Sequence, residues 1–244
     1  MNEQRDLEGL SALVTGATSG IGQAAAEQLA WAGAEVIVHG RDAGRGQAVT
    51  EAITTAGGKA RFVAADLTDR AELDALAQQA AGVDVLVNNA GSAWFGPTPE
   101  LDAKTFSLLL ATNVEAPYFL TAALAPNMAA RGNGSIVNIG SMAGEVGMPG
   151  GAAYGATKAA LDSMTRSWAA EYSPSGVRVN TIASGPVYTA IQPAEVTEAV
   201  GATTIMVRPA QPVEIANLIV FLASPKASYI TGAVIAVDGG RTAI

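Results

Sequence analysis

Near its N-terminus the 244-residue chain reads Leu13-Val14-Thr15-Gly16-Ala17-Thr18-Ser19-Gly20-Ile21-Gly22, and this stretch decides the prediction of the fold. An apolar run, Ala12–Val14, precedes the glycines and predicts a strand, while the Ala-rich segment Gly20–Ala32 predicts a helix. Glycines at such a junction let the backbone approach a pyrophosphate at the helix N-terminus. A tight strand-to-helix turn needs glycine in any case, so the loop alone leaves both a nucleotide site and a plain turn open.

Short runs rich in Val and Ile continue to alternate with longer Ala-rich stretches up to the C-terminus. Strands are predicted at Ala12–Val14, Glu35–Val38, Ala60–Ala64, Val83–Val87, Ser135–Ile139, Val177–Ile182 and Val234–Val237. Helices are predicted at Gly20–Ala32, Ala43–Ala56, Arg70–Ala80, Leu101–Arg131, Ala153–Tyr172 and Val213–Leu222. Strands buried on both faces between crossover helices form a parallel sheet, so we expect one Rossmann-type, doubly wound α/β domain over residues 1–244.

Composition excludes several classes of function. The net charge is −8, only 15% of the residues are charged, and no basic run is present, so a nucleic-acid or acidic-membrane partner is not expected. The chain has no cysteine and one histidine, His39, which argues against disulfides and metal sites. The N-terminal segment MNEQRDLEGL lacks the apolar core of a signal peptide, and we expect a soluble cytoplasmic protein.

The segment Tyr154-Gly155-Ala156-Thr157-Lys158 lies thirteen residues after Ser141 and combines a weak acid with a cation. On a helix, residues four positions apart share a face, so the phenol and the ammonium are neighbours. A nearby ammonium favours the phenolate and can bring the phenol toward proton transfer at neutral pH. Considered alone, the pair is more simply explained as an exposed Tyr and Lys stacked at helical spacing.

Further segments follow in order: Asp66, Asn88-Asn89-Ala90-Gly91, Asn113, Ser141, Tyr154-x-x-x-Lys158, and Gly185 to Thr189. Together with Thr15–Gly22 they resemble the short-chain dehydrogenase/reductase family along nearly the whole chain, in particular its members similar to 3-oxoacyl-[acyl-carrier-protein] reductase. The resemblance implies a nicotinamide-dependent enzyme that interconverts a ketone and a secondary alcohol.

The same resemblance implies four catalytic residues. Tyr154 would be the acid/base, Lys158 would bind the nicotinamide ribose and favour the phenolate, and Ser141 would hydrogen-bond the substrate oxygen. Asn113 would support a water-mediated proton relay to Lys158. It lies within a helical pattern where Asn has poor propensity, which also favours a functional role, although a packing role for Asn113 and a turn role for Ser141 remain alternatives.

A larger set of residues is expected to contact the dinucleotide, chiefly through the glycine loop and the ends of the following strands. These residues are Gly16, Thr18, Ser19, Gly20, Ile21, Gly22, Arg41, Asp66, Leu67, Asn89, Ala90, Gly91, Tyr154, Lys158, Val187 and Thr189. By resemblance, Asp66 contacts the adenine, and Val187 and Thr189 contact the carboxamide. The family usually has Pro-Gly-Pro where this chain has Ser184-Gly185-Pro186, which leaves the contacts of Val187 open.

The end of the second strand predicts which nicotinamide cofactor is used. An acidic residue there would bind the ribose hydroxyls of NAD, but the chain has Gly40 followed by Arg41, whose guanidinium suits the 2′-phosphate of NADP. NADP(H) is therefore favoured over NAD(H). Two residues argue against NADP(H). Many NADP-using relatives have a basic residue at the position of Ser19, and Asp42 lies next to the expected phosphate site. His39 is interpreted as a strand-end residue that could also help a phosphate contact.

The predicted substrate pocket is mostly apolar. Its expected walls are Ser92–Phe95, Met142–Ala153 and a lid at about Tyr188–Arg208, with apolar side chains at Trp94, Phe95, Met142, Val146, Met148, Tyr188, Ile191 and Met206. Some of these could instead pack the lid or a subunit contact. A small free ketone or secondary alcohol is the expected substrate.

Other functions remain alternatives. They are a 3-oxoacyl-[acyl-carrier-protein] reductase, an NAD-dependent alcohol or sugar dehydrogenase, and a non-catalytic dinucleotide-binding sensor. An acidic carrier protein needs a basic docking face, for which the chain offers only scattered candidates such as Arg131. The family resemblance also implies a homotetramer.

Overall fold

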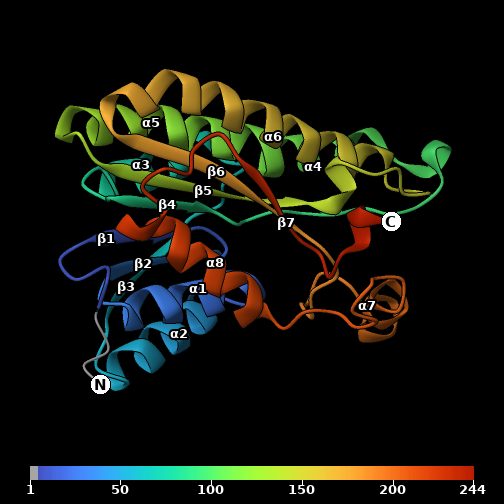
Figure 1. Ribbon diagram of the computed structural model, residues 1–244, viewed down its shortest axis with the longest axis horizontal. Helices are drawn as coiled ribbons and strands as arrows, with labels where there is room; N and C mark the ends of the chain where they lie inside the picture. Colours follow the sequence, from blue (N-terminus) through green and yellow to red (C-terminus); the bar gives the residue numbers. More distant parts are fainter. Residues whose placement is uncertain (1–4) are drawn as a thin grey trace.

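A parallel sheet forms the centre of the molecule, for which a computed structural model describes residues 5–244 (Figure 1). Its strands are β1 (Ser11–Val14), β2 (Glu35–Gly40), β3 (Lys59–Ala64), β4 (Val85–Asn88), β5 (Gly134–Ser141), β6 (Val177–Ser184) and β7 (Val234–Val237). Their order in the sheet is β3-β2-β1-β4-β5-β6-β7, and all six neighbouring pairs are parallel. The predicted doubly wound α/β fold is confirmed.

Helices cover both faces of this sheet (Figure 1). One face carries α1 (Gly20–Trp31), α2 (Ala43–Thr55) and α8 (Pro212–Ala223), and the other carries α3 (Arg70–Gln79), α4 (Ala103–Leu110), α5 (Ala116–Arg131) and α6 (Ala152–Tyr172). Two clusters of buried apolar side chains, one on each face, fill the space between the sheet and these helices. Burial on both faces explains why the strands are almost continuously apolar.

Several strands continue further than the apolar pattern predicted. β5 and β6 end at Ser141 and Ser184, which pair with each other in the sheet, and every residue of β5 is buried. Ser184 Oγ donates to the carbonyl of Gly140 at 3.3 Å, so its polar side chain is compatible with the strand. The polar ends of the central strands therefore belong to the sheet itself, and they hold the site residues on a rigid element.

The helix predicted over Leu101–Arg131 is wrong as a single helix. It consists of α4, a π-helical turn at Ala111–Glu115, and α5. In the turn the N–H of Ala116 bonds to the carbonyl of Ala111, five residues back. Pro117 lacks the N–H that would bond to residue 113 in an α-helix, which explains why the regular helix is interrupted there.

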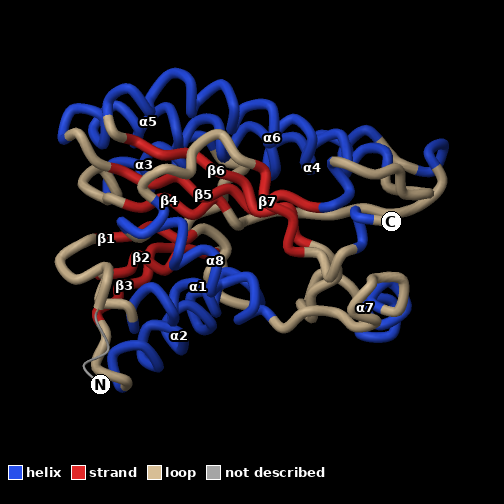
Figure 2. The backbone as a smooth tube through the Cα atoms, viewed as in Figure 1, coloured by secondary structure: helices blue, strands red, loops and turns tan. Residues whose placement is uncertain are grey.

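The segment between β6 and α8 contains a helix that the sequence pattern did not predict, α7 (Ala194–Gly201). Figure 2 shows it among long loops, to one side of the body of the sheet. It has eight residues, of which only Thr197 and Gly201 are buried, and it follows Pro193 within the segment that the sequence analysis assigned to the lid. A helix this short completes too few turns for its apolar period to stand out in the sequence.

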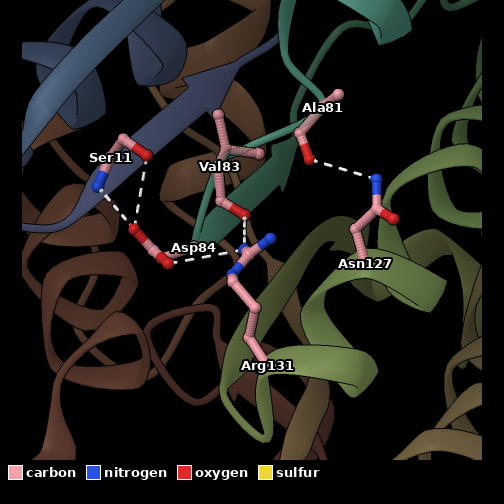
Figure 3. A network of polar contacts seen from close by, with 6 residues as sticks. All are labelled: Ser11, Ala81, Val83, Asp84, Asn127 and Arg131. Carbon is pink, nitrogen blue, oxygen red and sulfur yellow. Dashed lines mark hydrogen bonds and ion pairs between the residues drawn. The ribbon is translucent and has the colours of Figure 1, made fainter.

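A polar network fastens the amino-terminal ends of the central strands (Figure 3). Asp84 Oδ2 accepts from the N–H of Ser11 at 2.9 Å, and Arg131 donates to the carbonyl of Val83 at 2.7 Å and to Asp84 at 3.4 Å. Asn127 donates to the carbonyl of Ala81 at 3.3 Å. Arg131 therefore ties α5 to the sheet at the end opposite to the glycine loop, and it is not a free cation for a docking protein.

One helical run among residues 5–244 is long and apolar enough, by length and composition alone, to cross a membrane. It spans Ala103–Arg131 and has a mean hydropathy of 1.3 over its most apolar stretch. Of that stretch, 44% is buried inside the protein, where Leu120 and Leu124 pack in the core beneath the sheet. A core helix has these properties too, so the run is weak evidence for a membrane span.

Candidate active site

The glycine loop is packed too closely to carry side chains at two of its positions. A Cβ on Gly22 would lie 2.3 Å from the carbonyl oxygen of Gly16, and one on Gly16 would lie 2.9 Å from the Cα of Ala90. Gly16 also has a φ of +64°, which disfavours other residues. Ser19, the N-cap residue of α1, makes no side-chain cap hydrogen bond. The N–H groups of the first turn of α1 thus lack a side-chain cap and suit a diphosphate.

Thr15 and Asn89 lock this loop to the end of β4. Thr15 Oγ1 accepts from the N–H groups of Asn89 and Ala90 at 2.9 and 3.0 Å. Asn89 Nδ2 donates to the carbonyls of Thr15 and Gly16 at 2.8 and 3.2 Å. The glycine loop and the Asn88–Gly91 segment, far apart in the sequence, are therefore one rigid unit.

His39 supports the loop from the other side. Its Nδ1 accepts from the N–H of Gly16 at 3.3 Å, so Nε2 carries the proton and donates to the carbonyl of Ala65 at 3.1 Å. Burial lowers the pKa of His39 and keeps the ring neutral. Both nitrogens are thus used within the protein, which agrees with the interpretation of His39 as a structural strand-end residue.

The end of β2 has no room for an acidic side chain. A Cβ on Gly40 would lie 2.4 Å from Thr18 Cγ2, so the position usually associated with an NAD-binding acid is filled by Thr18. Arg41 follows and makes no ion pair with any of residues 5–244. Arg45 was missed by the sequence analysis: it lines the same cavity and pairs with Asp42 at 3.0 Å.

Two connected cavities lie at the carboxyl edge of the sheet. The larger one, with a volume of about 330 Å³, is lined by eleven of the predicted cofactor residues: Gly16, Thr18, Ser19, Ile21, Arg41, Asp66, Leu67, Asn89, Ala90, Gly91 and Thr189. The smaller one, about 140 Å³, is lined by Ser141, Tyr154, Lys158 and Val187. The walls that they share are Ile21, Asn89, Gly91, Ser92, Thr189 and Ile191. We call them the nucleotide cavity and the reaction cavity.

Tyr154 is half-buried in the wall of the reaction cavity, and its ring packs against Phe95 with a centroid distance of 5.3 Å. Burial raises the pKa of the phenol, and a hydrogen bond with Ser141 partly opposes this rise. Ser141 ends β5, and its Oγ also accepts from the N–H of Ala143 at 3.2 Å. The phenol and the serine hydroxyl are therefore adjacent in the reaction cavity.

Lys158 lies one turn further along α6 and is buried. Its Nζ donates to the carbonyl of Ile139 at 2.8 Å and lies 5.7 Å from the centroid of the Tyr154 ring. Burial lowers the pKa of Lys158 to about 8, and the charge of Asp162 opposes this effect. Burial and the hydrogen bond with Ser141 account for the shifted pKa of Tyr154, so the expected lowering of this pKa by the charge of Lys158 is not seen in the protein alone.

Asn113 lines neither cavity, and it acts on the site through the backbone. From the π-helical turn, its Oδ1 accepts from the N–H of Ser92 at 2.9 Å and its Nδ2 donates to the carbonyl of the same residue at 2.8 Å. Nδ2 also donates to Thr157 Oγ1 at 3.0 Å. Asn113 thus connects the cavity wall after β4 to α6. Gly91 lies between Asn113 and Lys158, since a Cβ on Gly91 would be 3.1 Å from Asn113 Oδ1 and 3.6 Å from Lys158 Nζ.

The Ser184-Gly185-Pro186 turn presents Val187 to the reaction cavity. A Cβ on Gly185 would lie 2.6 Å from the Cα of Asp238, so this glycine is required for the turn to pass the end of β7. Val187 is bridged to Ala210 and lines the reaction cavity. Thr189 covers the glycine loop, because a Cβ on Gly20 would meet its Cγ2 at 3.1 Å. Gly20 and Gly22, like Asn113, line neither cavity themselves.

Comparison with known proteins extends these observations. A profile of the family described as Enoyl-(Acyl carrier protein) reductase matches residues 16–242. A tropinone reductase homologue of Arabidopsis thaliana is 37% identical over 252 residues, covering 99% of this chain and 97% of the relative. These matches span the glycine loop, both cavities and the C-terminal strand.

Two solved structures resemble the whole chain. One, described as a short chain dehydrogenase/reductase family protein, has 50% identity and a TM-score of 0.91, and the match covers 98% of this chain and 100% of that one. The other is described, provisionally, as an NAD(P)-dependent gluconate 5-dehydrogenase from Beutenbergia cavernae with bound NADP at low occupancy. It has 39% identity and a TM-score of 0.94, with 99% and 100% of the two chains covered. The chain therefore belongs to the short-chain dehydrogenase/reductase family, whose members are NAD(P)-binding oxidoreductases that act on CH–OH groups.

Proposed function

We propose that the protein is an NADP(H)-dependent oxidoreductase that interconverts a ketone and a secondary alcohol, with Tyr154 as the acid/base. The observation that carries this proposal is that Ser141, Tyr154 and Lys158 line one small cavity whose walls are shared with the nucleotide cavity. A carbonyl group in the reaction cavity would lie next to a phenol, a hydroxyl and a dinucleotide site at once.

In the reduction direction, Tyr154 gives its proton to the carbonyl oxygen while Ser141 hydrogen-bonds the same oxygen. Because burial raises the pKa of Tyr154, the phenol is protonated at neutral pH and is ready to donate. In the oxidation direction the phenolate is required, and alkaline pH favours it. Lys158 has a pKa of about 8 and is charged below it, so its ammonium group stabilises negative charge on nearby oxygen atoms.

The nucleotide cavity fits a dinucleotide. The α1 N-terminus and the crowded glycines suit the diphosphate, Asp66 and Leu67 suit the adenine end, and Val187 with Thr189 suits the carboxamide. The nicotinamide, when bound, supplies the hydride acceptor or donor. Tyr154 and Lys158 line the reaction cavity, Lys158 lies next to Gly91 in the shared wall, and both residues would contact the ribose.

The preference for NADP(H) rests on Arg41 and Gly40. The guanidinium of Arg41 is exposed at the cavity rim and unpaired within the described residues, so it can bind a 2′-phosphate without breaking an ion pair. An acid that would hold the ribose hydroxyls of NAD cannot occupy position 40 while Thr18 keeps its position. Arg45 offers a second guanidinium, although Asp42 holds it.

The substrate class is proposed from the apolar walls. Beyond Met142, Met148 and Val200, the reaction cavity adjoins a further cavity of about 500 Å³ whose walls are mainly apolar side chains of the 142–149 segment and α7. Hydrophobic walls favour ketones with an apolar body over polar sugar acids. Residues 188–208 would form the lid over such a substrate, with α7 as its helical part.

Several large apolar side chains are exposed on this chain, which supports a homotetramer. They include Phe106, Tyr118, Phe221, Tyr229 and Ile244, with exposed fractions between 38% and 102%. Light scattering coupled to size-exclusion chromatography measures the assembly directly. A monomer at micromolar concentration would refute this part of the proposal.

The decisive experiment is a screen of ketones and secondary alcohols with both reduced and oxidised cofactors, followed by nicotinamide absorbance, in the parent protein and in Tyr154→Phe. We expect turnover with NADPH, and a loss of at least ~10³-fold in Tyr154→Phe with little change in the Kd for NADPH. A Tyr154→Phe protein with full turnover would refute the proposed role. Preference for gluconate-like substrates over apolar ketones would refute the substrate class alone.

A further inference from the structure

Of the residues that the structure describes, two carboxyl groups are buried, and they differ in how they are satisfied. Asp238 accepts from the N–H groups of Gly240 and Thr242, both at 2.8 Å, and from the hydroxyl of Thr242 at 2.7 Å. Asp162 is 5% exposed, and its Oδ1 has no hydrogen-bond partner among the described residues. A buried carboxylate oxygen without a partner is costly, so its presence calls for an explanation.

Asp162 lies under the turn that carries Ser141. A Cβ on Gly140 would lie 3.3 Å from Asp162 Oδ1, and a Cβ on Gly144 would lie 3.2 Å from Asp162 Oδ2. These two glycines flank the segment Ser141-Met142-Ala143 on either side. The carboxylate is therefore packed directly against both ends of this turn, and a side chain at either glycine would crowd it together with Thr181 or the backbone of α6.

The helix α6 holds this part of the chain at two neighbouring points. Lys158 Nζ binds the carbonyl of Ile139, directly before Gly140, and Asp162 follows one helical turn later. Tyr154, Lys158 and Asp162 occupy positions i, i+4 and i+8, which share one face of α6. The next polar residue of the face, Thr165, bonds to Asn138 at 2.7 Å and so continues the contact along β5.

We propose that Asp162 is a positioning residue: its carboxylate supports the turn that presents Ser141 and balances the buried ammonium of Lys158, so that turnover requires Asp162 to be ionised. The inference rests on the proposed function, because it assigns Asp162 to the site that contains Ser141, Tyr154 and Lys158. Asp162 acts through these residues and does not line the reaction cavity.

The charges around Asp162 come from three directions. Burial and the exposed Glu145 after the turn raise its pKa, whereas Arg166 and Lys158 on α6 and the hydroxyl of Thr181 on β6 lower it. Together these effects give Asp162 a pKa of about 6. A carboxyl group with a pKa near 6 changes its charge just below neutral pH. His39, the only histidine of the chain, has a lowered pKa and lies in the loop support on the nucleotide side.

The first test measures stability, which does not depend on turnover. Asp162→Asn removes the buried charge with little change of shape. Because the folded pKa of Asp162 lies above its unfolded value of 3.8, the wild type loses stability as pH rises from about 4 to about 6. We therefore expect Asp162→Asn to raise the thermal midpoint by several degrees at pH 8, and by almost nothing at pH 4.

Asp238→Asn is the matched control for this test. Burial raises the pKa of Asp238, but its hydrogen bonds together outweigh burial and hold the pKa below its usual range, so the ionised form stabilises the protein above that range. We expect Asp238→Asn to lower the thermal midpoint at pH 8. If Asp162→Asn lowers it as well, Asp162 is an ordinary structural acceptor and the proposal is overturned.

The second test measures the pH dependence of kcat with NADPH and the best ketone from the screen. The wild type should lose activity below an acid midpoint of about 6, and Asp162→Asn should lose this acid limb and have a kcat about ten-fold lower at pH 7. A complete absence of turnover in the wild type would refute the proposed function. In that case the stability test would still show whether the buried carboxylate of Asp162 is ionised and destabilising at pH 8.

Two surface variants keep the second test decisive if Asp162→Asn fails to fold. Removing the charge of Glu145 in Glu145→Gln should lower the acid midpoint by a few tenths of a pH unit, and Arg166→Gln should raise it by a similar amount. Both side chains are exposed, so the maximal kcat should stay within about two-fold. Shifts in the same direction, or none at low ionic strength, would overturn the assignment of the acid limb to Asp162.

Discussion

The nucleotide cavity and the reaction cavity lie side by side at one edge of the sheet, yet they are built in different ways. Around the nucleotide cavity, backbone groups and glycines determine the shape, and the side chains of Thr15, His39 and Asn89 hydrogen-bond to the backbone of the glycine loop and of the segment after β4. Around the reaction cavity, two buried ionisable groups, Lys158 and Asp162, have pKa values shifted by burial. The contacts of the first region stabilise the fold, whereas the buried charges of the second region lower the stability of the folded protein.

The comparison teaches where function and stability oppose each other. Substitutions on the nucleotide side should disturb packing and binding together, because each glycine there is in contact with another segment. Substitutions of the charged groups on the reaction side should reduce activity and increase stability. The following predictions test this contrast.

The largest effect is expected for the two hydroxyls of the reaction cavity. Ser141→Ala should lower kcat by about 10²-fold and Tyr154→Phe by about 10³-fold, since both act on the same substrate oxygen. The double variant should be no worse than Tyr154→Phe within about three-fold, because residues that act as a unit are not additive. Steady-state kinetics with NADPH measures all three. Fully additive losses would mean that the hydroxyls act separately.

Lys158→Met should have a lower kcat than the wild type but be more stable at neutral pH, by on the order of 3 kcal/mol. The folded pKa of Lys158, about 8, lies below its unfolded value of 10.5, so the wild type gains stability as pH rises from about 8 to 10.5. In denaturant titrations, the free energies of unfolding of the wild type and Lys158→Met should therefore become more similar over this pH range. If Lys158→Met were less stable than the wild type at pH 7, the buried charge near the reaction cavity would not be destabilising, and the contrast with the nucleotide cavity would be refuted.

On the nucleotide side, Gly40→Asp alone should not create an NAD-dependent enzyme. Its Cβ would displace Thr18, so binding of both cofactors should weaken at least about ten-fold, and Gly40→Ala should do the same. Adding Thr18→Ser to Gly40→Asp removes the Cγ2 that lies 2.4 Å away and should restore binding of NADH in preference to NADPH. If Gly40→Asp uses NADH efficiently by itself, packing at this position is not the constraint.

The smallest effect is expected for Arg41→Ala, which should raise the KM for NADPH about ten-fold and leave that for NADH within about two-fold. The difference in the KM for NADPH between Arg41→Ala and the wild type should diminish as salt is added, because Arg41 is exposed. Arg61 is a matched control: it lies on β3, is exposed, and donates to the carbonyl of Gln79 at 2.7 Å. Arg61→Ala should change neither KM. Equal effects of the two variants would refute the role of Arg41.

The fold and most of the site were predictable because their signals are local. The glycine loop, the strands and the Tyr154–Lys158 spacing each depend on neighbouring residues, and the structure contains all seven predicted strands. The π-helical turn at Asn113 was predictable only in part: an Asn in a helix was the signal, but the role of Pro117 was overlooked. The helix α7 was missed because eight residues are too few for a helical period to be recognised within the segment assigned to the lid.

The sequence by itself determined the doubly wound fold, the nucleotide loop and the candidates for acid/base chemistry, because chain-local periodicity and spacing encode them. Only the tertiary structure decided that Thr18 fills the space beside Gly40, that His39 supports Gly16, and that Asp162 lies beneath the Ser141 turn. These contacts join segments distant along the chain, and their energies depend on burial. Burial, and the pKa shifts that it causes, are properties of the folded molecule.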